Sequence, residues 1–335
     1  MNDIKDLLKK LTETYGPSGN EEEIRRVIEE EMHEYVDEID IDVMGNLIAY
    51  KKGNGQGKKV MLSAHMDQIG LIVTHIDDNG FLRFSNVGGI SVLNTINGRV
   101  IFKNGTIGTV SYENEIENIK DIKLNRMYID IGANSCEEAA EKVSIGDVAV
   151  YYSPLAESNG RYIGGAMDNR SGCALLIETI KELKDCKNDA YFVFSVQEEV
   201  GLRGAKTSAY SINPDVGIAV DVTSTGDTPK ARTMAVKLGA GPAIKVKDGS
   251  VICHPKVKDL MIDRAEDIDI PYQIEVLEWG GTDAGAIHLT REGIPSGAVS
   301  IPCRYVHSAN EMVDEKDLEN GVKLLVKILE NEIEL

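Results

Sequence analysis

Two patterns of apolar and polar positions alternate along most of the chain. Short, uniformly apolar runs such as 190–194 and 216–220 are separated by segments in which apolar residues recur every three or four positions, as in 173–183. The first pattern is typical of strands buried on both faces of a parallel sheet, and the second of amphipathic helices. Strands that alternate with helices predict an α/β fold, with a mostly parallel sheet covered by helices on both faces.

The region from residue 69 to residue 155 departs from this pattern. Its apolar runs are short and are separated by turn residues, for example at 77–80, 97–98 and 104–105. Such regular spacing of short strands predicts a small β-barrel or sandwich, and a helix is expected near 136–143. The region therefore reads as an insertion into the α/β domain.

The length and composition agree with this division. A chain of 335 residues is long for one domain, and its 42% of hydrophobic residues can form a large core. We expect a discontinuous α/β domain made of residues 1–68 and 156–335, and an inserted β-rich domain made of residues 69–155. The formal net charge of -19 argues against binding to nucleic acid or to anionic membrane surfaces, both of which are negatively charged.

The cysteines and the N-terminus provide information on where in the cell the protein is expected. The five cysteines are scattered and include no C-x-x-C pair, so they indicate neither a disulfide framework nor a zinc knuckle. Reduced thiols are typical of the cytosol. The N-terminus has no apolar signal region, and no stretch approaches the length that spans a membrane. We therefore expect a soluble, cytoplasmic protein.

Side chains that can bind metal ions follow several of the predicted strands. Carboxyl ends of parallel strands meet at one edge of an α/β sheet, and the chemistry of such folds gathers there. Two histidines and several carboxylates, with no cysteine among them, suit a hydrolytic zinc, cobalt or manganese site. The candidates are His65, Asp67, Asp168, Glu198, Glu199, Asp221 and His307.

Six short motifs carry a resemblance to a known family. In chain order they are His65-Met66-Asp67, Met167-Asp168-Asn169-Arg170, Gln197-Glu198-Glu199-Val200-Gly201, Asp221, Gly280-Gly281-Thr282-Asp283-Ala284-Gly285 and Arg304-Tyr305-Val306-His307-Ser308. With these motifs the chain resembles the di-metal tetrahedral aminopeptidases, whose members are also called glutamyl aminopeptidases or cellulase-M-like endoglucanases. The resemblance spans nearly the whole chain, including an insertion directly after the His-x-Asp motif.

The resemblance implies a set of metal ligands. Asp168 would bridge two divalent metal ions, zinc or cobalt with manganese as an alternative. His65 and Asp221 would complete one metal site, and Glu199 and His307 would complete the other. The family also implies that the insertion mediates assembly, with dimers building a hollow tetrahedral dodecamer, and that the substrates are short peptides.

The resemblance also implies roles for two acids that are not ligands. Glu198 would be the general base, and Asp67 would orient the His65 imidazole. Two metal ions roughly 3.5–4 Å apart acidify a bridging water and polarise a carbonyl group, which peptide hydrolysis at neutral pH requires. Neighbouring side chains of an extended segment diverge, so one carboxylate of the Glu198–Glu199 pair can face the metals while the other reaches the water. The residues alone leave open which carboxylate does which.

Other functions compete with an aminopeptidase. A glycosidase needs two carboxyl groups that flank one bond and needs no metal, so it would leave the two histidines unused. Two further alternatives are a related metallo-deacylase or dipeptidase and a shell protein that binds metal only for assembly. The preferred N-terminal residue of the substrate stays open.

Four residues near the motifs also stay ambiguous. Thr282 and Asp283 are expected either to line the substrate pocket or to cap the following helix. Trp279 either borders the pocket or only packs, and His254 is expected to be structural.

Overall fold

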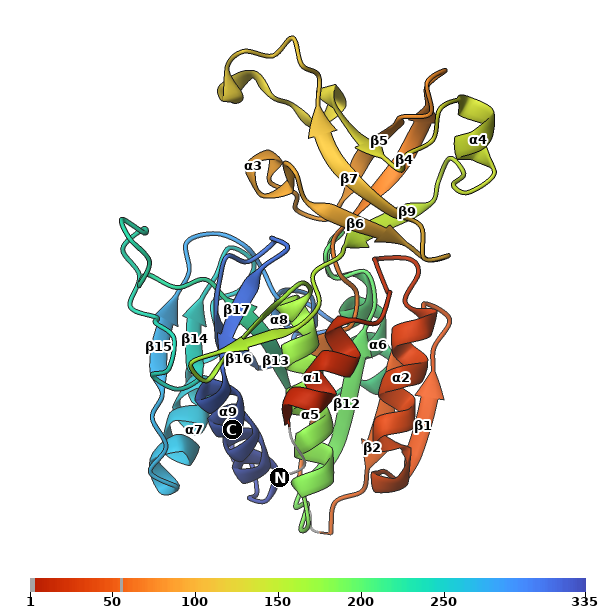
Figure 1. Ribbon diagram of the computed structural model, residues 1–335. Helices are drawn as coiled ribbons and strands as arrows, with labels where there is room; N and C mark the ends of the chain where they lie inside the picture. Colours follow the sequence, from red (N-terminus) through yellow and green to blue (C-terminus); the bar gives the residue numbers. More distant parts are fainter. Residues whose placement is uncertain (1–3, 55–56) are drawn as a thin grey trace.

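The computed structural model describes residues 4–54 and 57–335 (Figure 1). It confirms the α/β fold and the small antiparallel barrel. The main sheet has the strand order β1-β2-β12-β3-β13-β16-β17-β11-β10, and β14 and β15 extend from β16. Within the described residues, no helix is both long enough and apolar enough to cross a membrane.

The centre of the main sheet is parallel, and its strands are the predicted apolar runs. The four central strands are β12 (Asp189–Ser195), β3 (Lys59–His65), β13 (Val216–Thr223) and β16 (Ser296–Arg304). Every residue of β13 is buried, as expected for a strand covered on both faces. The register pairs Ser195 with His65, so these two strands end at the same level of the sheet.

Antiparallel strands flank this centre. On one side lie β1 (Glu38–Ile41) and β2 (Leu47–Lys51). On the other side lie β17 (Glu311–Asp314), β11 (Arg161–Gly164), β10 (Ala156–Ser158), β14 (Ala243–Lys247) and β15 (Gln273–Val276). The four parallel central strands therefore carry most of the predicted site, and β14 and β15 form a separate parallel pair.

Helices cover both faces of the sheet (Figure 1). One face packs against α1 (Ile4–Thr12), α2 (Glu22–Met32), α5 (Met167–Glu182), α7 (Pro255–Asp267) and α9 (Glu315–Leu329), and the other against α6 (Arg203–Ile212) and α8 (Ala284–Ile287). Successive residues of a strand point to opposite faces. Accordingly Leu62 of β3 belongs to the larger core and Met61 belongs to the smaller one.

The inserted region forms a closed barrel with a core of its own. Its strands are β4 (Gly70–Ile76), β5 (Leu82–Val87), β6 (Arg99–Phe102), β7 (Ile107–Tyr112), β8 (Met127–Asp130) and β9 (Val148–Tyr151), and they close in the order β4-β5-β8-β7-β6-β9. The expected helix is α4 (Cys136–Ala140), which is shorter than predicted, and a further short helix, α3 (Val92–Thr95), was not predicted. Single-turn helices occur at His33–Tyr35, Ile119–Asp121 and Leu124–Arg126.

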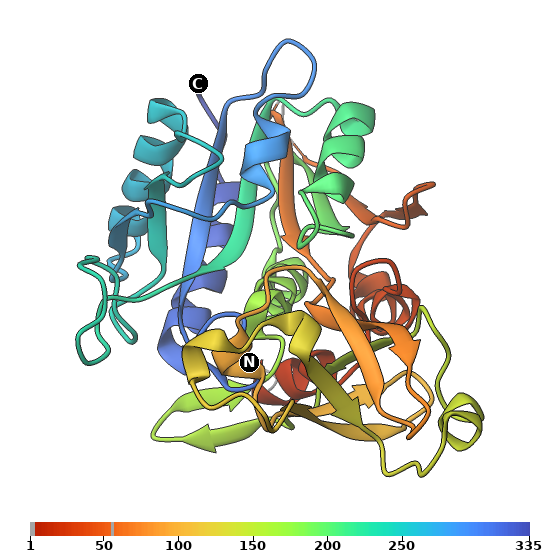
Figure 2. The same ribbon diagram turned by 90° about the horizontal axis from the view of Figure 1, so that it is seen from above.

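The barrel stands at the edge of the sheet where β3 ends. The chain leaves β3 at His65, enters β4 at Gly70 and returns from β9 to β10 after Tyr151. Seen from above, the barrel covers only part of the sheet's edge, and the teal and cyan segment near residues 243–276 lies to one side of it (Figure 2). We still propose 69 and 155 as the domain boundaries, since both fall in these connections.

Candidate metal centre

The predicted ligands lie together in one cleft at the edge where the parallel strands end. We call this cavity the ligand cleft; its volume is about 510 Å³. Six of the seven candidates line it, namely His65, Asp168, Glu198, Glu199, Asp221 and His307. The side chain of the seventh, Asp67, is fully buried beside the others.

Two clusters of potential ligands share one carboxylate. The ligand atoms of His65, Asp168 and Asp221 all lie within 4.8 Å of one another, and so do those of Asp168, Glu199 and His307. Asp168 Oδ1 lies 3.1 Å from His65 Nε2, and Asp168 Oδ2 lies 3.3 Å from His307 Nε2. The two oxygens of Asp168 therefore face different histidines, which is the arrangement that a bridging carboxylate requires.

One polar atom of these clusters is left unsatisfied by the protein alone. Glu199 Oε1 is buried and has no hydrogen-bond partner, while Glu199 Oε2 lies 3.3 Å from His307 Nε2. Leaving a buried carboxylate oxygen without a partner is costly. Imidazole nitrogens and carboxylate oxygens are ligands of divalent zinc, cobalt and manganese. The donor set and the unpartnered oxygen therefore fit divalent cations.

The buried acids outnumber the histidines, and their protonation is strongly perturbed. Burial raises the pKa of Glu198 well above its usual range, and the charge of Asp221 adds to this. Burial likewise raises the pKa of Asp221 to about 7. Burial would also raise the pKa of Asp168, but the two histidines that face it lower that pKa instead. So much buried negative charge calls for cations.

The same charges also shift the pKa values of the two histidines. Burial alone would lower the pKa of His65 and of His307, because it disfavours the charged ring. The carboxylates around each ring outweigh this effect and raise both pKa values. A metal ion that binds these rings therefore competes with protons for their nitrogens.

The side chains of the adjacent glutamates diverge, although the pair lies in the turn that follows β12 and not in the extended segment that the sequence predicted. Glu199 belongs to a ligand cluster, and its side chain is 4% exposed. Glu198 belongs to neither cluster, and its Oε2 lies 3.8 Å from His65 Nε2. Among the described residues, this geometry makes Glu199 the potential ligand and leaves Glu198 free to contact another molecule in the cleft.

Asp67 contacts more than the imidazole that it was expected to orient. The closest acceptor to His65 Nδ1 is the main-chain carbonyl of Asp67, at 3.1 Å, whereas the carboxylate lies at 3.5 Å. That carboxylate accepts hydrogen bonds from the N–H groups of Glu198 and Glu199, at 3.0 and 3.3 Å, and from Ser18 Oγ at 2.5 Å. Asp67 therefore holds the glutamate pair as well as the His65 ring.

Glu311 is a site residue that the sequence did not reveal. Its buried carboxylate accepts hydrogen bonds from the N–H of Asp168, at 3.0 Å, and from the N–H of His307, at 2.7 Å. Burial raises its pKa to about 8, and the nearby charge of Asp168 contributes. Its only signal in the sequence is an acid at the start of a strand, four residues after His307, and a solvated surface acid gives the same signal.

The Gly-Gly-Thr-Asp segment has a structural role that neither alternative foresaw. Asp283 makes no capping bond to α8; its Oδ2 accepts hydrogen bonds from Ser63 Oγ and Ser195 Oγ, both at 2.6 Å. The carboxylate thus joins β3 to β12 near their ends. Trp279 lines the ligand cleft, whereas Thr282 and His254 do not.

Two glycines of the inserted region, between β5 and α3, pack against the potential ligands, and Gly89 lines the ligand cleft. A Cβ atom on Gly89 would lie 2.7 Å from the imidazole of His307, and one on Gly88 would lie 3.1 Å from Glu199 Cβ. Gly88 also has a φ of +77°, which other residues rarely adopt. These glycines allow the segment to pack directly against two potential ligands.

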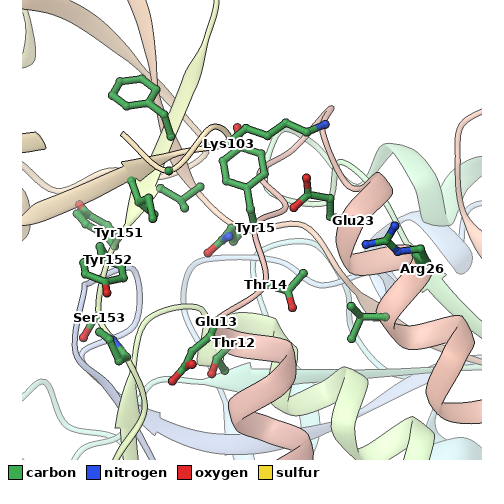
Figure 3. Close-up of a pocket in the computed structure, with 17 residues that line it drawn as sticks. Thr12, Glu13, Thr14, Tyr15, Glu23, Arg26, Lys103, Tyr151, Tyr152 and Ser153 are labelled. Atoms are coloured by element: carbon green, nitrogen blue, oxygen red, sulfur yellow. The ribbon is translucent and has the colours of Figure 1, made fainter. Parts of the chain in front are cut away.

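A second cavity, of about 430 Å³, lies between the barrel and the α1–α2 region. Figure 3 shows Thr12, the last residue of α1, and the residues 13–15 after it facing Lys103 of the barrel and the segment 151–153 where the chain leaves the barrel. Glu23 and Arg26 of α2 lie beside them. None of the candidate ligands lines it. We call it the second cavity.

Comparison with known proteins places the chain in a family. The model of the M42 glutamyl aminopeptidase family matches residues 45–324. A putative aminopeptidase of Acetivibrio thermocellus is 59% identical over 98% of both chains. A lysyl aminopeptidase of Pyrococcus furiosus is 36% identical over 97% of this chain and 96% of its own.

Solved structures give the same result, which agrees with the fold and with the geometry of the potential ligands. An aminopeptidase from the archaeon Desulfurococcus kamchatkensis has a TM-score of 0.94 at 40% identity, covering 98% of this chain and 94% of its own. The TET1 peptidase of Pyrococcus horikoshii, described as assembling into a tetrahedron or a large octahedral shell, has a TM-score of 0.85 at 36% identity, covering 98% and 99%. The chain therefore belongs to the M42 glutamyl aminopeptidase family, whose members are metal-dependent peptidases.

Proposed function

We propose that this protein removes N-terminal residues from short peptides by two-metal hydrolysis of the peptide bond. The observation that carries the proposal is the pair of ligand clusters that share Asp168, with Glu198 beside them in the same cleft. Family membership supports the class of reaction. The adjacent clusters support the metal requirement, because they crowd buried carboxylates together and leave Glu199 Oε1 without a hydrogen-bond partner.

The metals proposed are zinc or cobalt, with manganese as an alternative. His65 and Asp221 would hold one ion, Glu199 and His307 the other, and Asp168 both. Bound in this way, two divalent ions supply an acidified water and a polarised carbonyl group. The nitrogen and oxygen donors accept any of the three metals, so reconstitution with each metal in turn is the way to identify the active form.

Glu198 is proposed as the general base. Its carboxylate lies in the cleft but outside both clusters, so its oxygens are free for a proton of the attacking water. The raised pKa, caused first by burial, suits a group that accepts this proton and returns it to the leaving amine near neutral pH. Asp67 holds the backbone of Glu198 and Glu199 and so positions both side chains.

We further propose that the barrel mediates assembly into a tetrahedral dodecamer. Large apolar side chains are exposed on it, including Leu93, Ile119 and Ile145, which are 63%, 59% and 66% exposed. Exposed apolar side chains are typical of surfaces that contact another chain. Light scattering checks this: a mass of about one chain would contradict it. Because β4 begins beside His65, we expect chelation of the metals to reduce the assembled mass.

A cytoplasmic location is proposed on the basis of the cysteines. All five are free, and four of them are buried. Free cysteines suit a reducing compartment.

The test of the proposed reaction uses aminoacyl-p-nitroanilides and metal-reconstituted protein. Release of nitroaniline that disappears with chelation and returns with metal is expected. The glycosidase alternative predicts the opposite, namely activity on carboxymethyl-cellulose that survives removal of the metals. The clustering of both histidines with the carboxylates favours the peptidase, since glycoside hydrolysis has no use for these rings.

A further inference from the structure

The part of the ligand cleft that is not made of candidate ligands is apolar. Its large side chains are Leu202, Val222, Leu277, Trp279 and Val306, which we call the apolar wall. The remaining lining residues are glycines and two small hydroxyl residues, Thr223 and Ser224. Among the described lining residues, the only acids are Glu198 and the potential ligands, and none is lysine or arginine.

A buried basic group, Lys245, is linked to the lining residue Thr223 through Glu275 and is already paired with acids. Lys245 is fully buried and donates a hydrogen bond to Glu275, and its Nζ lies 3.5 Å from Asp248. Thr223 Oγ1 donates to Glu275 Oε1 at 2.8 Å, so the Thr223 hydroxyl proton is not available to a ligand. The wall therefore presents no unpaired positive charge to the cleft from this direction.

The other nearby cation lies at the outer rim. The guanidinium of Arg232 stacks on the ring of Trp279, 4.4 Å from its centroid, and Arg232 does not line the cleft. The indole thus separates that charge from the interior. A charged side chain inside the cleft would lose water without gaining a partner of opposite charge, which is unfavourable.

The positions of the acidic residues determine which part of a bound peptide contacts the apolar wall. The ammonium group of a free N-terminus needs a negative partner when it leaves water, and the cleft offers acids only at the ligand clusters and at Glu198. The carbonyl group to be cleaved must reach the same clusters. Both backbone groups of the first residue are therefore anchored there, and its side chain is left to contact the apolar wall.

We infer that the cleft selects peptides whose N-terminal residue has an uncharged apolar side chain, such as leucine or methionine, over lysine or glutamate. The inference rests on the proposed function and specifies the substrate of that same site. A volume of about 510 Å³ leaves room for such a side chain together with the peptide backbone. The selection contrasts with the glutamyl name of the family and with the lysyl specificity in the name of the Pyrococcus furiosus relative.

The first experiment is a substrate panel on the full-length, metal-loaded protein. Aminomethylcoumarin amides of leucine, methionine, lysine, arginine, glutamate and aspartate are compared by kcat/KM. We expect leucine and methionine to exceed each charged residue by about tenfold or more, the discrimination typical of a pocket without matching charge. Equal rates, or a preference for lysine or glutamate, would overturn the inference and leave the proposed function intact. No turnover of any substrate would overturn both.

The second experiment places a charge in the wall. Leu277, which is 8% exposed and follows β15, is replaced in Leu277→Glu and in its uncharged match Leu277→Gln. The glutamate variant is expected to raise the ratio of lysine to leucine turnover at least about tenfold above that of the glutamine variant. Both variants are checked for metal content. If both retain metal and show the same ratio, Leu277 does not contact the substrate side chain and the inference fails.

Discussion

The ligand cleft and the second cavity have similar volumes, about 510 and 430 Å³, and different chemistry. In the second cavity, Lys103 and Arg26 are exposed to solvent, and the Tyr15 hydroxyl donates a hydrogen bond to the carbonyl of Val148 at 2.9 Å. No described residue that lines it has a buried side-chain polar atom without a partner. In the ligand cleft, buried acids crowd together, and an oxygen of Glu199 is left unpartnered.

This difference shows that the volume of a cavity does not identify a site. Burying charge that the protein cannot satisfy costs stability, so such a cluster persists where a ligand offsets the cost. The exposed charges of the second cavity remain in water and need no ligand. The contrast can be tested by substitutions in both cavities, from those with the largest expected effect to those with the smallest.

The largest effect is expected from Asp168→Asn. An amide cannot bridge two cations as a carboxylate does, so both ions should be lost and activity should disappear. His307→Ala removes a ligand of one cluster only, so it should lower the metal content to about one ion per chain. Elemental analysis of purified protein measures both. Equal metal content in the two variants would contradict the shared carboxylate.

Glu198→Gln should retain its metals and its assembly but lose turnover by a factor of about 10² to 10⁴, the usual contribution of a general base. The substitution preserves the shape of the side chain and removes only its basicity. The readouts are kcat on a leucine anilide and metal content by elemental analysis. Turnover close to that of the parent protein would mean that the base is another group.

Glu311→Gln is expected to weaken metal binding by about 10- to 100-fold, as substitutions of residues that orient ligands do. A glutamine can accept a hydrogen bond from the N–H of Asp168 or of His307, but its amide nitrogen then faces the other N–H. The matched control is Glu315→Gln, because Glu315 accepts a hydrogen bond from Tyr162 outside the clusters. Titration with a competing chelator measures the affinity, and identical affinities for the two variants would refute the role given to Glu311.

The smallest effects are expected in the second cavity. Arg26→Gln and Lys103→Gln remove exposed charges, so the free energy of unfolding should change by no more than about 0.5 kcal/mol. Metal content and kcat should stay at the level of the parent protein. Denaturant unfolding, elemental analysis and the anilide assay measure these three quantities. A large loss of activity in either variant would mean that the second cavity takes part in the reaction and that the comparison is wrong.

The sequence predicted the features that depend on regular patterns. Uniformly apolar runs revealed the central strands, since these are buried on both faces, and the polar residue at the end of each run then fell at a common edge. His65 and Asp221 were found in this way, and Glu199 and His307 follow the same kind of run within a few residues. Short runs between turn residues revealed the β-rich insertion.

The features that the sequence did not reveal depend on contacts between distant segments. Whether six short strands close into a barrel is decided by the pairing of β4 with β9, which no local pattern encodes. Glu311 acts through two backbone N–H groups, one of them 143 residues away, so nothing nearby marks it. Asp283 was expected either to line the pocket or to cap a helix, because its partners, Ser63 and Ser195, lie on strands far away in the sequence.

The two glycines between β5 and α3 limit how this protein can be re-engineered. Because Gly88 and Gly89 of the insertion pack against Glu199 and His307, the barrel supplies part of the inner surface around the reacting groups. A chimaera that takes its barrel from a relative to obtain a different shell would exchange that surface as well. Such a graft has to keep this pair of glycines, or its turnover will change together with its quaternary structure.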